Sequence, residues 1–239
     1  MHVSTIEISV VVPVFNEVDN IGPLVERVRS TMKELGRPWQ LVLVDDGSTD
    51  GSSEEMDAAA ASDPHVTVLH FVENCGQSAA LSAGFAATDS ELVALLDADL
   101  QTFPEDLPGL VEILEREGID AVVGVRAERR DTLWKRFSSI VANGVRNWLT
   151  REDIQDTGCP IKIFRGEAIR RIEPFDGMHR FLPTLLKMRG CSVLQVPVRH
   201  TRRAAGVSKY GTLDRAWRGL RDALGVRWMQ DRAVRWRIK

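Results

Sequence analysis

The segment LVALLDADLQTFP, residues Leu92 to Pro104, decides the fold of this chain. Its apolar run, Leu92 to Leu96, has the length of a buried strand and stops at two carboxylates, Asp97 and Asp99. Side chains two residues apart lie on the same face of an extended chain, so both carboxylates converge just beyond the end of the strand. Open parallel sheets bind ligands at that edge. The alternative is a solvated acidic turn, and the rest of the chain decides between the two.

The composition is that of a globular protein. The 239 residues are 44% hydrophobic and 27% charged, which is enough for one large domain or a domain with an appendage. The formal net charge of −3 hides an asymmetry, because from Arg202 onward there are eleven Lys and Arg against three Asp. The residues before Arg202 carry 20 basic and 31 acidic side chains. An acidic body with a basic tail indicates two kinds of partner.

Targeting signals and cysteine pairs are not evident in the sequence. No run of about 18 apolar residues occurs, so no transmembrane helix is expected. The apolar run Ile8 to Phe15 follows a segment without Lys or Arg, which argues against a signal peptide. The cysteines are scattered without metal-ligand spacing, which favours reduced thiols in the cytosol. They are Cys75, Cys159 and Cys191.

Strand and helix patterns alternate along the first half of the chain. The expected strands cover residues 8–14, 40–44, 66–71, 92–96 and 121–125. The expected helices cover residues 21–35, 52–61, 78–87 and 106–117. This alternation predicts an α/β fold with a parallel sheet and right-handed connections.

Polar residues, rather than a glycine-rich phosphate loop, follow the first two strands. The chain contains neither GxGxxG after the first strand nor GxxxxGK[ST], which disfavours dinucleotide oxidoreductases and P-loop enzymes. A nucleotide is still possible, because Asp45 or Asp46 can accept hydrogen bonds from a ribose or a base. The alternative for Asp45 to Ser48 is a simple turn that caps the next helix.

Four motifs resemble glycosyltransferase family 2, whose members have the GT-A fold. They are PVFNE (13–17), VDDGSTD (44–50), NCGQSAA (74–80) and DADLQTFPED (97–106). A closer similarity to the polyprenyl-phosphate branch, which is dolichol-phosphate mannosyltransferase-like, rests on four further segments. These are GVR (124–126) followed by Arg129 and Arg130, QDTGCPIKIFR (155–165), MHRFLP (178–183) and VRHTRRAAGVSKYG (198–211). The resemblance spans residues 8 to 210 and therefore nearly the whole chain.

The resemblance implies a GT-A (Rossmann-like), mostly parallel sheet flanked by helices, with amphipathic basic helices at the C-terminus. The expected catalytic domain covers residues 1–211 and includes an amphipathic interface helix at about 132–151. Residues 212–239 are expected to form a basic, Trp- and Arg-rich membrane-associating tail.

The resemblance also assigns roles to individual residues. Those expected to bind the nucleotide-sugar are Pro13, Asn16, Glu17, Asp45, Asp46, Gln77 and Asp97. Those expected to hold Mg²⁺ or Mn²⁺ on the donor diphosphate are Asp97, Asp99 and Gln101. Those expected to bind the acceptor phosphate are Arg126, Arg130, His179, Arg202, Ser208 and Lys209. The expected catalytic residues are Asp99, Asp156, Arg126, Arg202 and Lys209. For His179, a purely structural role is an equal alternative.

The chemistry of sugar transfer explains these residue types. Cleavage at the anomeric carbon leaves a diphosphate with growing negative charge, which a hard cation held by carboxylates neutralises. A hydroxyl acceptor needs a general base, whereas a phosphate monoester, with a second pKa of about 6, is already ionised at neutral pH. Asp156 is therefore either a base for a hydroxyl acceptor or a residue that orders Arg and metal.

Two segments suit a membrane surface. In residues 132–151, apolar side chains and Trp148 recur at helical spacing between basic residues, and the tail contains Trp217, Trp228 and Trp236 among many Arg. An ordinary helix packed on the core is the alternative for the first segment, and docking onto a separate membrane protein is the alternative for the tail. No nucleic-acid-binding motif accompanies the basic residues.

The resemblance thus implies an inverting, metal-dependent hexosyltransferase of cell-envelope glycan biosynthesis. Its donor would be a UDP- or GDP-sugar and its acceptor undecaprenyl or dolichyl phosphate. The enzyme would be peripheral (monotopic) at the cytoplasmic face of the membrane. One alternative is a glycosyltransferase that acts on the hydroxyl of a glycan or glycolipid, with Asp156 as base. The other is a non-catalytic, membrane-bound scaffold that binds a sugar nucleotide.

Overall fold

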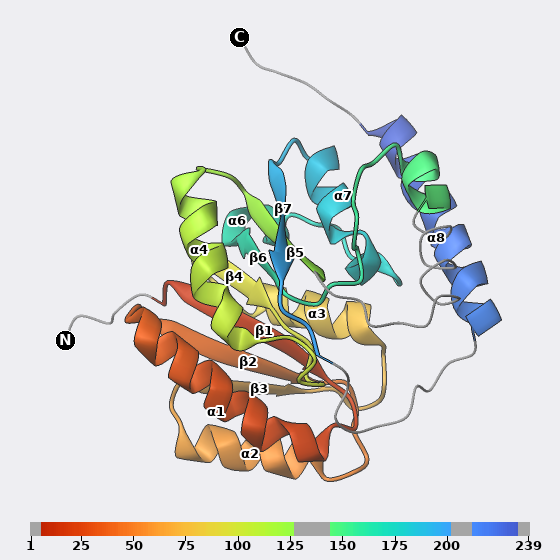
Figure 1. Ribbon diagram of the computed structural model, residues 1–239. Coiled ribbons are helices and arrows are strands. Elements are labelled where there is room, and N and C mark those ends of the chain that lie inside the picture. The colour runs from red at the N-terminus through yellow and green to blue at the C-terminus, as the bar shows by residue number, and fades with distance from the viewer. Residues whose placement is uncertain (1–5, 127–143, 202–211, 234–239) are drawn as a thin grey trace.

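The computed structural model describes residues 6–126, 144–201 and 212–233 of the chain (Figure 1). The first part of the helix expected at 132–151 and the last residues of the basic tail, 234–239, lie outside these ranges. Residues 144–150 are helical, as expected for the second part of that segment.

One sheet of seven strands forms the centre of the described residues. The strands are β1 (Ile8–Val14), β2 (Trp39–Asp45), β3 (Val66–His70), β4 (Leu92–Leu95), β5 (Ala121–Arg126), β6 (Lys162–Arg165) and β7 (Val193–Val198). Their order in the sheet is β3-β2-β1-β4-β6-β5-β7. Strand β6 runs antiparallel to β4 and β5, and the other neighbours are parallel. The expected mostly parallel sheet is therefore confirmed, and the antiparallel β6 is an addition that the sequence pattern did not indicate.

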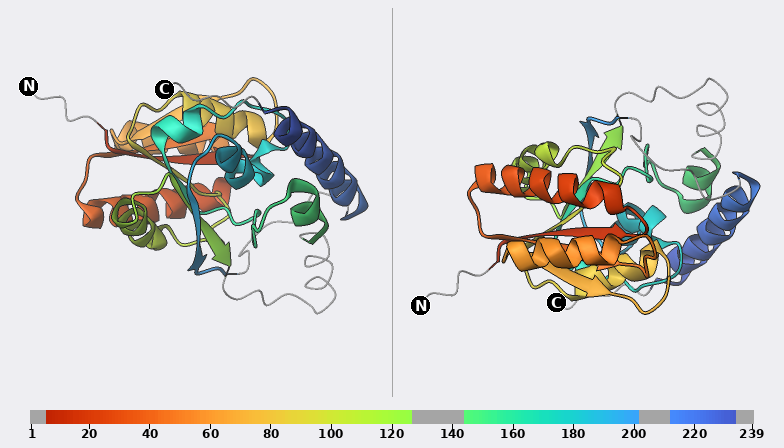
Figure 2. Two further views of the ribbon diagram at one scale, coloured as in Figure 1. Left: turned by 90° about the horizontal axis from the view of Figure 1, so that it is seen from above. Right: turned by 90° about the horizontal axis from the view of Figure 1, so that it is seen from below.

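Helices cover both faces of the sheet (Figure 2). They are α1 (Val18–Leu35), α2 (Ser52–Ser62), α3 (Gln77–Ala86), α4 (Leu107–Arg116), α6 (Gly166–Arg170), α7 (Leu182–Met188) and α8 (Thr212–Arg232). Two short 3₁₀ helices, η1 (Pro104–Asp106) and η2 (Met178–Arg180), precede α4 and α7. All elements expected in the first half of the chain are present, with ends that differ by a few residues.

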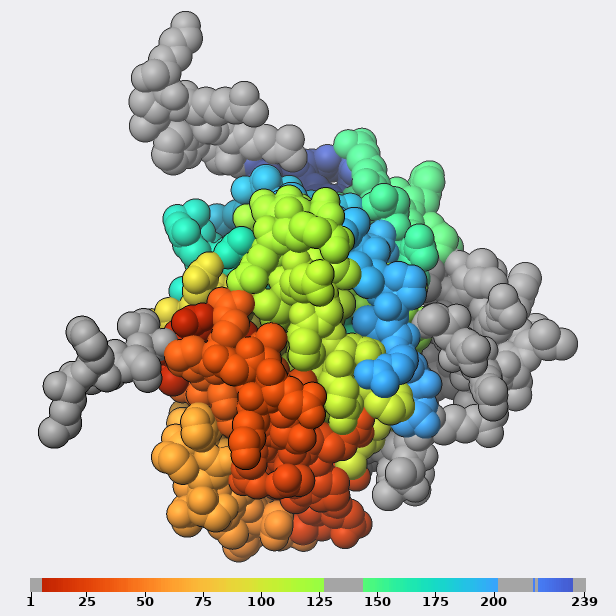
Figure 3. Space-filling model, turned by 60° about the vertical axis from the view of Figure 1, so that its left-hand side comes forward, coloured from red at the N-terminus to blue at the C-terminus, as the bar shows by residue number. Residues whose placement is uncertain are grey.

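The alternation of side chains along the strands divides the core into two layers. In β1, Val10 and Val12 pack with α1 and α4, whereas Val11 packs with α3 on the other face. The space-filling view in Figure 3 shows α4 between α1 and β7 on the first of these faces. The second face also carries α7 and the inner side of α8, including the buried Ala223 and Val226.

The sheet order brings the polar ends of four strands to one edge. Strands β1 to β4 are mutually parallel, so Asn16, Asp45, His70 and Asp97, which end or follow these strands, lie at the same side of the sheet. Because β6 is antiparallel, its first residue, Lys162, pairs with Leu95 near the end of β4. The chain that leads into β6 therefore also reaches this edge.

We predict that Gly47→Ala destabilises the fold far more than Gly36→Ala. Both glycines have a left-handed backbone, with φ of +70° and +69°, which costs an alanine roughly 1–2 kcal/mol. A Cβ at Gly47 would also lie 2.6 Å from the backbone N of Asn74, whereas one at Gly36 meets nothing within 4 Å. Urea denaturation should therefore give a loss of unfolding free energy at Gly47 that exceeds the loss at Gly36 by at least about 1 kcal/mol. Equal losses would contradict the close approach of the two loops.

Candidate active site

Asp97 and Asp99 lie together in the loop that follows β4. The loop turns sharply, because Leu100 between Asp99 and Gln101 has a φ of 57°. The Gln101 side-chain amide donates to Asp99 Oδ2 at 2.7 Å, and its backbone N donates to Asp99 Oδ1 at 3.2 Å. From α3, the Gln77 amide donates to Asp97 Oδ1 at 3.1 Å. The structure thus brings together all the residues expected to hold the metal, and Gln77 with them.

The carboxylate of Asp97 is partly buried beside the charge of Asp99. Burial, followed by the charge of Asp99, raises the pKa of Asp97 to about 6, although the charges of Lys162 and Arg126 act in the opposite direction. Among the described residues no cluster of three His, Cys, Asp or Glu side chains is arranged as a metal site. Mg²⁺ and Mn²⁺ need fewer protein ligands when phosphates supply the others, so a carboxylate pair with an amide fits such an ion.

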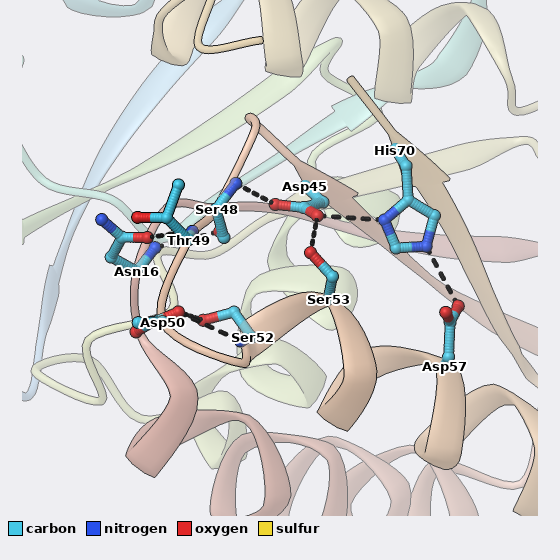
Figure 4. Close-up of polar contacts among 9 residues, drawn as sticks. All are labelled: Asn16, Asp45, Ser48, Thr49, Asp50, Ser52, Ser53, Asp57 and His70. Atoms are coloured by element: carbon cyan, nitrogen blue, oxygen red, sulfur yellow. Dashed lines mark hydrogen bonds and ion pairs between the residues drawn. The ribbon is translucent and has the colours of Figure 1, made fainter. Parts of the chain in front are cut away.

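Asp45 and Asp46 are buried, and their carboxylates fix the neighbouring loops by hydrogen bonds. The Asp45 carboxylate accepts hydrogen bonds from the Ser48 backbone N at 2.9 Å, from the Ser53 hydroxyl at 2.5 Å and from His70 (Figure 4). The Asp46 carboxylate accepts from the backbone N of Cys75 at 2.7 Å and of Gly76 at 3.0 Å, and from the Asn74 amide. Both aspartates shape the wall of the site, and direct contact with a base or ribose stays a prediction.

The loop after β1 is fixed to the loop after β2. Asn16 has a left-handed φ of 56°, and its backbone N donates to Ser48 Oγ at 3.0 Å. Its side-chain oxygen accepts from the Thr49 backbone N at 2.8 Å (Figure 4). Glu17 accepts from the Asn20 amide at 2.6 Å, and Pro13 lies beside Val44 in the sheet register. Asn16 and Glu17 follow β1 at the same edge of the sheet as Asp45, and their contact with a nucleotide stays a prediction.

Arg126 and Asp156 form a bidentate ion pair on the other side of the carboxylates. Arg126 Nε lies 2.6 Å from Asp156 Oδ2, and Nη2 lies 2.7 Å from Oδ1. Asp156 is 4% exposed. A Cβ at Gly158 would come within 3.2 Å of Arg126 Nη2, so a glycine leaves room for the guanidinium. The pair holds Arg126 in one orientation.

Lys162 belongs to the site and was not expected from the sequence. It is 2% exposed at the start of β6, and its ammonium donates to the Cys159 carbonyl. Burial lowers its pKa, while the charges of Asp97 and Asp156 partly oppose this shift. A lysine inside the apolar run PIKIF (160–164) was the available signal, because a lysine is almost never fully buried unless it is paired.

His179 is held as a neutral ring. Its Nδ1 lies 2.8 Å from the Ser78 hydroxyl, which also accepts from the Gly177 backbone N at 3.0 Å. Burial lowers the pKa of His179 to about 3, so the ring carries no charge at neutral pH. Any contact with a phosphate would therefore be a hydrogen bond rather than an ion pair.

Four of the expected site residues lie outside the described ranges. They are Arg130, Arg202, Ser208 and Lys209. The chain just before Arg202 is described, and Thr201 donates its backbone N to the Gln101 carbonyl at 2.9 Å. Thr102 and His200 form an antiparallel bridge at the same place. The segment that leads to Arg202 therefore starts beside the loop of Asp99.

The sequence profile of glycosyl transferase family 2 matches residues 9–172. The chain belongs to this family. It is 38% identical over 230 residues to a dodecaprenyl-phosphate galacturonate synthase of Rhizobium johnstonii, which covers 94% of this chain and 67% of the relative. It is 36% identical over 208 residues to an undecaprenyl-phosphate 4-deoxy-4-formamido-L-arabinose transferase of Pectobacterium carotovorum, covering 86% and 63%. The chain thus spans about two thirds of the length of these relatives.

Solved structures agree with this fold. A Mycobacterium tuberculosis glucosyl-3-phosphoglycerate synthase, in complex with Mn²⁺, UDP and glucosyl-3-phosphoglycerate, superposes with a TM-score of 0.69 at 20% identity, covering 96% of this chain and 81% of that one. A Pyrobaculum calidifontis mannosyltransferase in complex with GDP-Man and Mn²⁺ gives a TM-score of 0.62 at 22% identity, covering 99% and 67%. The predicted family and fold class are confirmed.

We predict that Asp97→Asn stabilises the metal-free protein while it removes metal binding. The pKa of Asp97 is raised from 3.8 to about 6, so its contribution to stability is present below pH 3.8 and is lost as the pH rises through about 6. The amide avoids this loss at neutral pH.

Thermal denaturation in EDTA should give a higher midpoint for Asp97→Asn than for the wild type at about pH 7.5, and a smaller difference at about pH 5. Calorimetry with Mn²⁺ and UDP should show that the variant has lost metal-dependent binding. Asp89→Asn, an exposed carboxylate at the opposite edge of the sheet, is the matched control. A lower midpoint for Asp97→Asn at neutral pH would contradict the raised pKa of Asp97.

Proposed function

We propose that this chain transfers a sugar from a nucleoside diphosphate donor to a polyprenyl phosphate, with inversion at the anomeric carbon. One observation carries the proposal: the Asp97 and Asp99 pair lies between loops suited to a nucleotide and a partly buried arginine, Arg126, suited to a second phosphate. The names of the two relatives, which act on dodecaprenyl and undecaprenyl phosphate, support the acceptor class.

The donor side of the proposed site is the loop region around Asn16, Asp45 and Gln77. Asp97 and Asp99, with Gln101, would hold Mg²⁺ or Mn²⁺. Such an ion, when bound, supplies positive charge to the departing diphosphate. The structures solved with UDP or GDP-Man and Mn²⁺ support this assignment at the level of the fold.

The acceptor side is centred on Arg126. A guanidinium grips phosphate oxygens well, and Asp156 holds this one in place by two hydrogen bonds of 2.6 and 2.7 Å. Because both oxygens of Asp156 already accept from Arg126, Asp156 suits a positioning role better than that of a general base. A phosphate acceptor needs no base, since it attacks with an oxygen that is already ionised. These contacts therefore favour a phosphate over the alternative hydroxyl acceptor.

An exposed apolar stripe on α8 supports contact with a membrane. Trp217, Leu220, Leu224 and Trp228 recur at helical spacing, and the two Trp are 69% and 63% exposed. Trp148, 79% exposed, projects from the helix at 144–150, which the Gln230 amide joins to α8 through the Thr150 carbonyl.

Amphipathic helices with exposed Trp and Arg bind anionic bilayer interfaces. None of the described helices has the length and hydropathy of a membrane span. Peripheral attachment at the cytoplasmic face is the proposed location, and docking of α8 onto a separate membrane protein is the alternative.

We predict that the acceptor phosphate is essential. Incubation of the protein with Mn²⁺, a panel of UDP- and GDP-sugars and undecaprenyl phosphate should give a lipid whose mass has increased by one sugar. Undecaprenol, which lacks the phosphate, is the matched control and should remain unchanged. The product should lose its sugar in mild acid, as a glycosyl phosphate does. Transfer to undecaprenol, or to a glycan hydroxyl in the same assay, would contradict the proposed acceptor.

We predict that the double variant Trp217→Ser, Trp228→Ser binds membranes weakly. Burial of each indole in the interface contributes roughly 1.5–3 kcal/mol, so affinity for vesicles with anionic lipid should fall by at least about tenfold. Flotation of the protein with such vesicles measures the loss. Val72→Ser, at a fully exposed apolar residue that lies in a loop away from α8, is the matched control. It should bind as the wild type does. Unchanged flotation of the double variant would exclude the stripe as the attachment surface.

A further inference from the structure

His70 lies between two carboxylates at the carboxyl end of β3 (Figure 4). Its Nδ1 lies 3.0 Å from Asp45 Oδ2, and its Nε2 lies 3.0 Å from Asp57 Oδ1. Asp45 comes from the neighbouring strand, where the register places it beside His70, and Asp57 comes from α2. The histidine therefore connects a buried carboxylate of the site to an exposed one on the surface.

Both contacts require a protonated ring. A neutral imidazole has a single N–H, so it can donate to only one of the two carboxylates at a time. The imidazolium has two N–H groups and satisfies both. The hydrogen bonds to Asp45 and then to Asp57 raise the pKa of His70 above its ordinary value, and these two carboxylates are the charged groups that act on the ring. Asp45 faces the ring from β2, Asp57 faces it from α2, and β3 itself carries no other titratable side chain.

Asp45 connects His70 to the loops that are expected to bind the nucleotide. Its other hydrogen bonds are to the Ser48 backbone N and the Ser53 hydroxyl, so it fixes the start and the end of the turn that follows β2. Ser48 Oγ in turn accepts from the Asn16 backbone N at 3.0 Å. A continuous series of hydrogen bonds thus runs from Asp57 through His70 and Asp45 to Asn16.

We propose that His70 is a positioning residue for the nucleotide half of the site. Its protonated ring fixes the Asp45 carboxylate, and through it the loop of residues 46–53 against Asn16, in the conformation that binds a nucleoside diphosphate. This inference rests on the proposed function. It adds that donor affinity depends on a histidine that touches neither the donor nor the metal, and that this affinity falls as the pH rises.

The sign of the pH dependence follows from the contacts. A histidine whose pKa is raised in the folded protein stabilises it fully below the ordinary value of 6.5, and this stabilisation is lost as the pH rises through the raised value. Above that pH the ring can keep one of its two carboxylate contacts. The loop of residues 46–53 is then less firmly held, so it loses more conformational entropy when the nucleotide binds.

Calorimetric titration with UDP, and separately with GDP, in the presence of Mn²⁺ tests the proposal between about pH 6 and pH 8.5. The proteins compared are the wild type, His70→Ala, Asp57→Asn and the control His65→Ala. His65 also pairs with an aspartate, Asp63, at 2.8 Å, but at the opposite end of β3. Because UDP itself takes up a proton at about pH 6, the quantity compared is the ratio of variant to wild-type affinity at each pH.

We expect His70→Ala to bind the nucleotide about fivefold more weakly than the wild type at the low end of this range, and the ratio to approach one at the high end. Asp57→Asn should bind as the wild type at the low end and lose affinity at a lower pH than the wild type does, because one of the carboxylates that raise the pKa of His70 is gone. Asp57 is largely exposed, so this variant is expected to fold even if His70→Ala does not. His65→Ala should keep a ratio of one throughout.

The possible outcomes distinguish a failure of this inference from a failure of the proposed function. If the wild type binds the nucleotide and the ratio of variant to wild-type affinity is one at every pH for both His70→Ala and Asp57→Asn, the role of His70 is overturned. The proposed function is then unaffected. A constant deficit of His70→Ala at every pH, with no change in Asp57→Asn, would also overturn the role of His70, because a merely structural histidine would behave in that way. Absence of wild-type binding to both UDP and GDP would refute the proposed function and the inference with it.

Discussion

The burial of Asp97 beside a second carboxylate, Asp99, is the constraint on which the rest of the site depends. Burial first, and then the charge of Asp99, raises the pKa of Asp97, so keeping this carboxylate ionised costs free energy. The surrounding structure offsets it with cations, since Lys162 and Arg126 both act on Asp97. A divalent ion would offset it further. The cost in the metal-free protein and the proposed affinity for a metal therefore have the same physical origin.

The reversed direction of β6 is what brings Lys162 and Asp156 to the site. A parallel strand next to β4 would begin at the opposite edge of the sheet, far from the carboxylates. Because β6 is antiparallel, the segment that precedes it, with Asp156 and Cys159, and its first residue, Lys162, lie where β4 ends. One change of strand direction thus gives the edge both a buried ammonium and the carboxylate that orients Arg126. The topology of the sheet therefore determines which charged groups surround the carboxylates.

The sequence predicted the first five strands because each contains a short, largely apolar run, such as ISVVVPV, bounded by polar residues. It did not predict β6 and β7. The four residues KIFR contain a lysine and an arginine, and VLQVPV contains a proline and is only half-buried, so neither has the pattern of a central strand. These two strands form because they pair with β4 and β5, which are distant in sequence, and a local sequence pattern contains no information about such pairing.

The same distinction applies to the site residues. Asp97, Asp99 and Gln101 are close in sequence, and strand geometry alone brings them together. Lys162 and His70 act through partners that are distant in sequence, such as Asp97 and Asp57. For Lys162 the apolar run PIKIF (160–164) around it was the available signal. For His70 there was none, because a single histidine at the end of a strand is usually solvated.

The helix α8 shows why an amphipathic pattern alone could not distinguish a core helix from a surface helix. It has two apolar sides. Ala223 and Val226 are buried against the core, while Trp217, Leu224 and Trp228 point outward. A helix that served only to pack would carry polar residues on its outer side.

The attachment of α8 fixes the direction of this outer side relative to the carboxylates. Asp222 pairs with Arg180 at 3.1 Å and lies so close to Gly177 that a Cβ there would come within 2.5 Å of its carboxylate. Gly177 in turn donates to Ser78, the partner of His179. These contacts connect α8, which carries the stripe, to the loops around His179. If a bilayer meets the stripe as proposed, the packing of α8 sets the height of a lipid phosphate relative to Arg126.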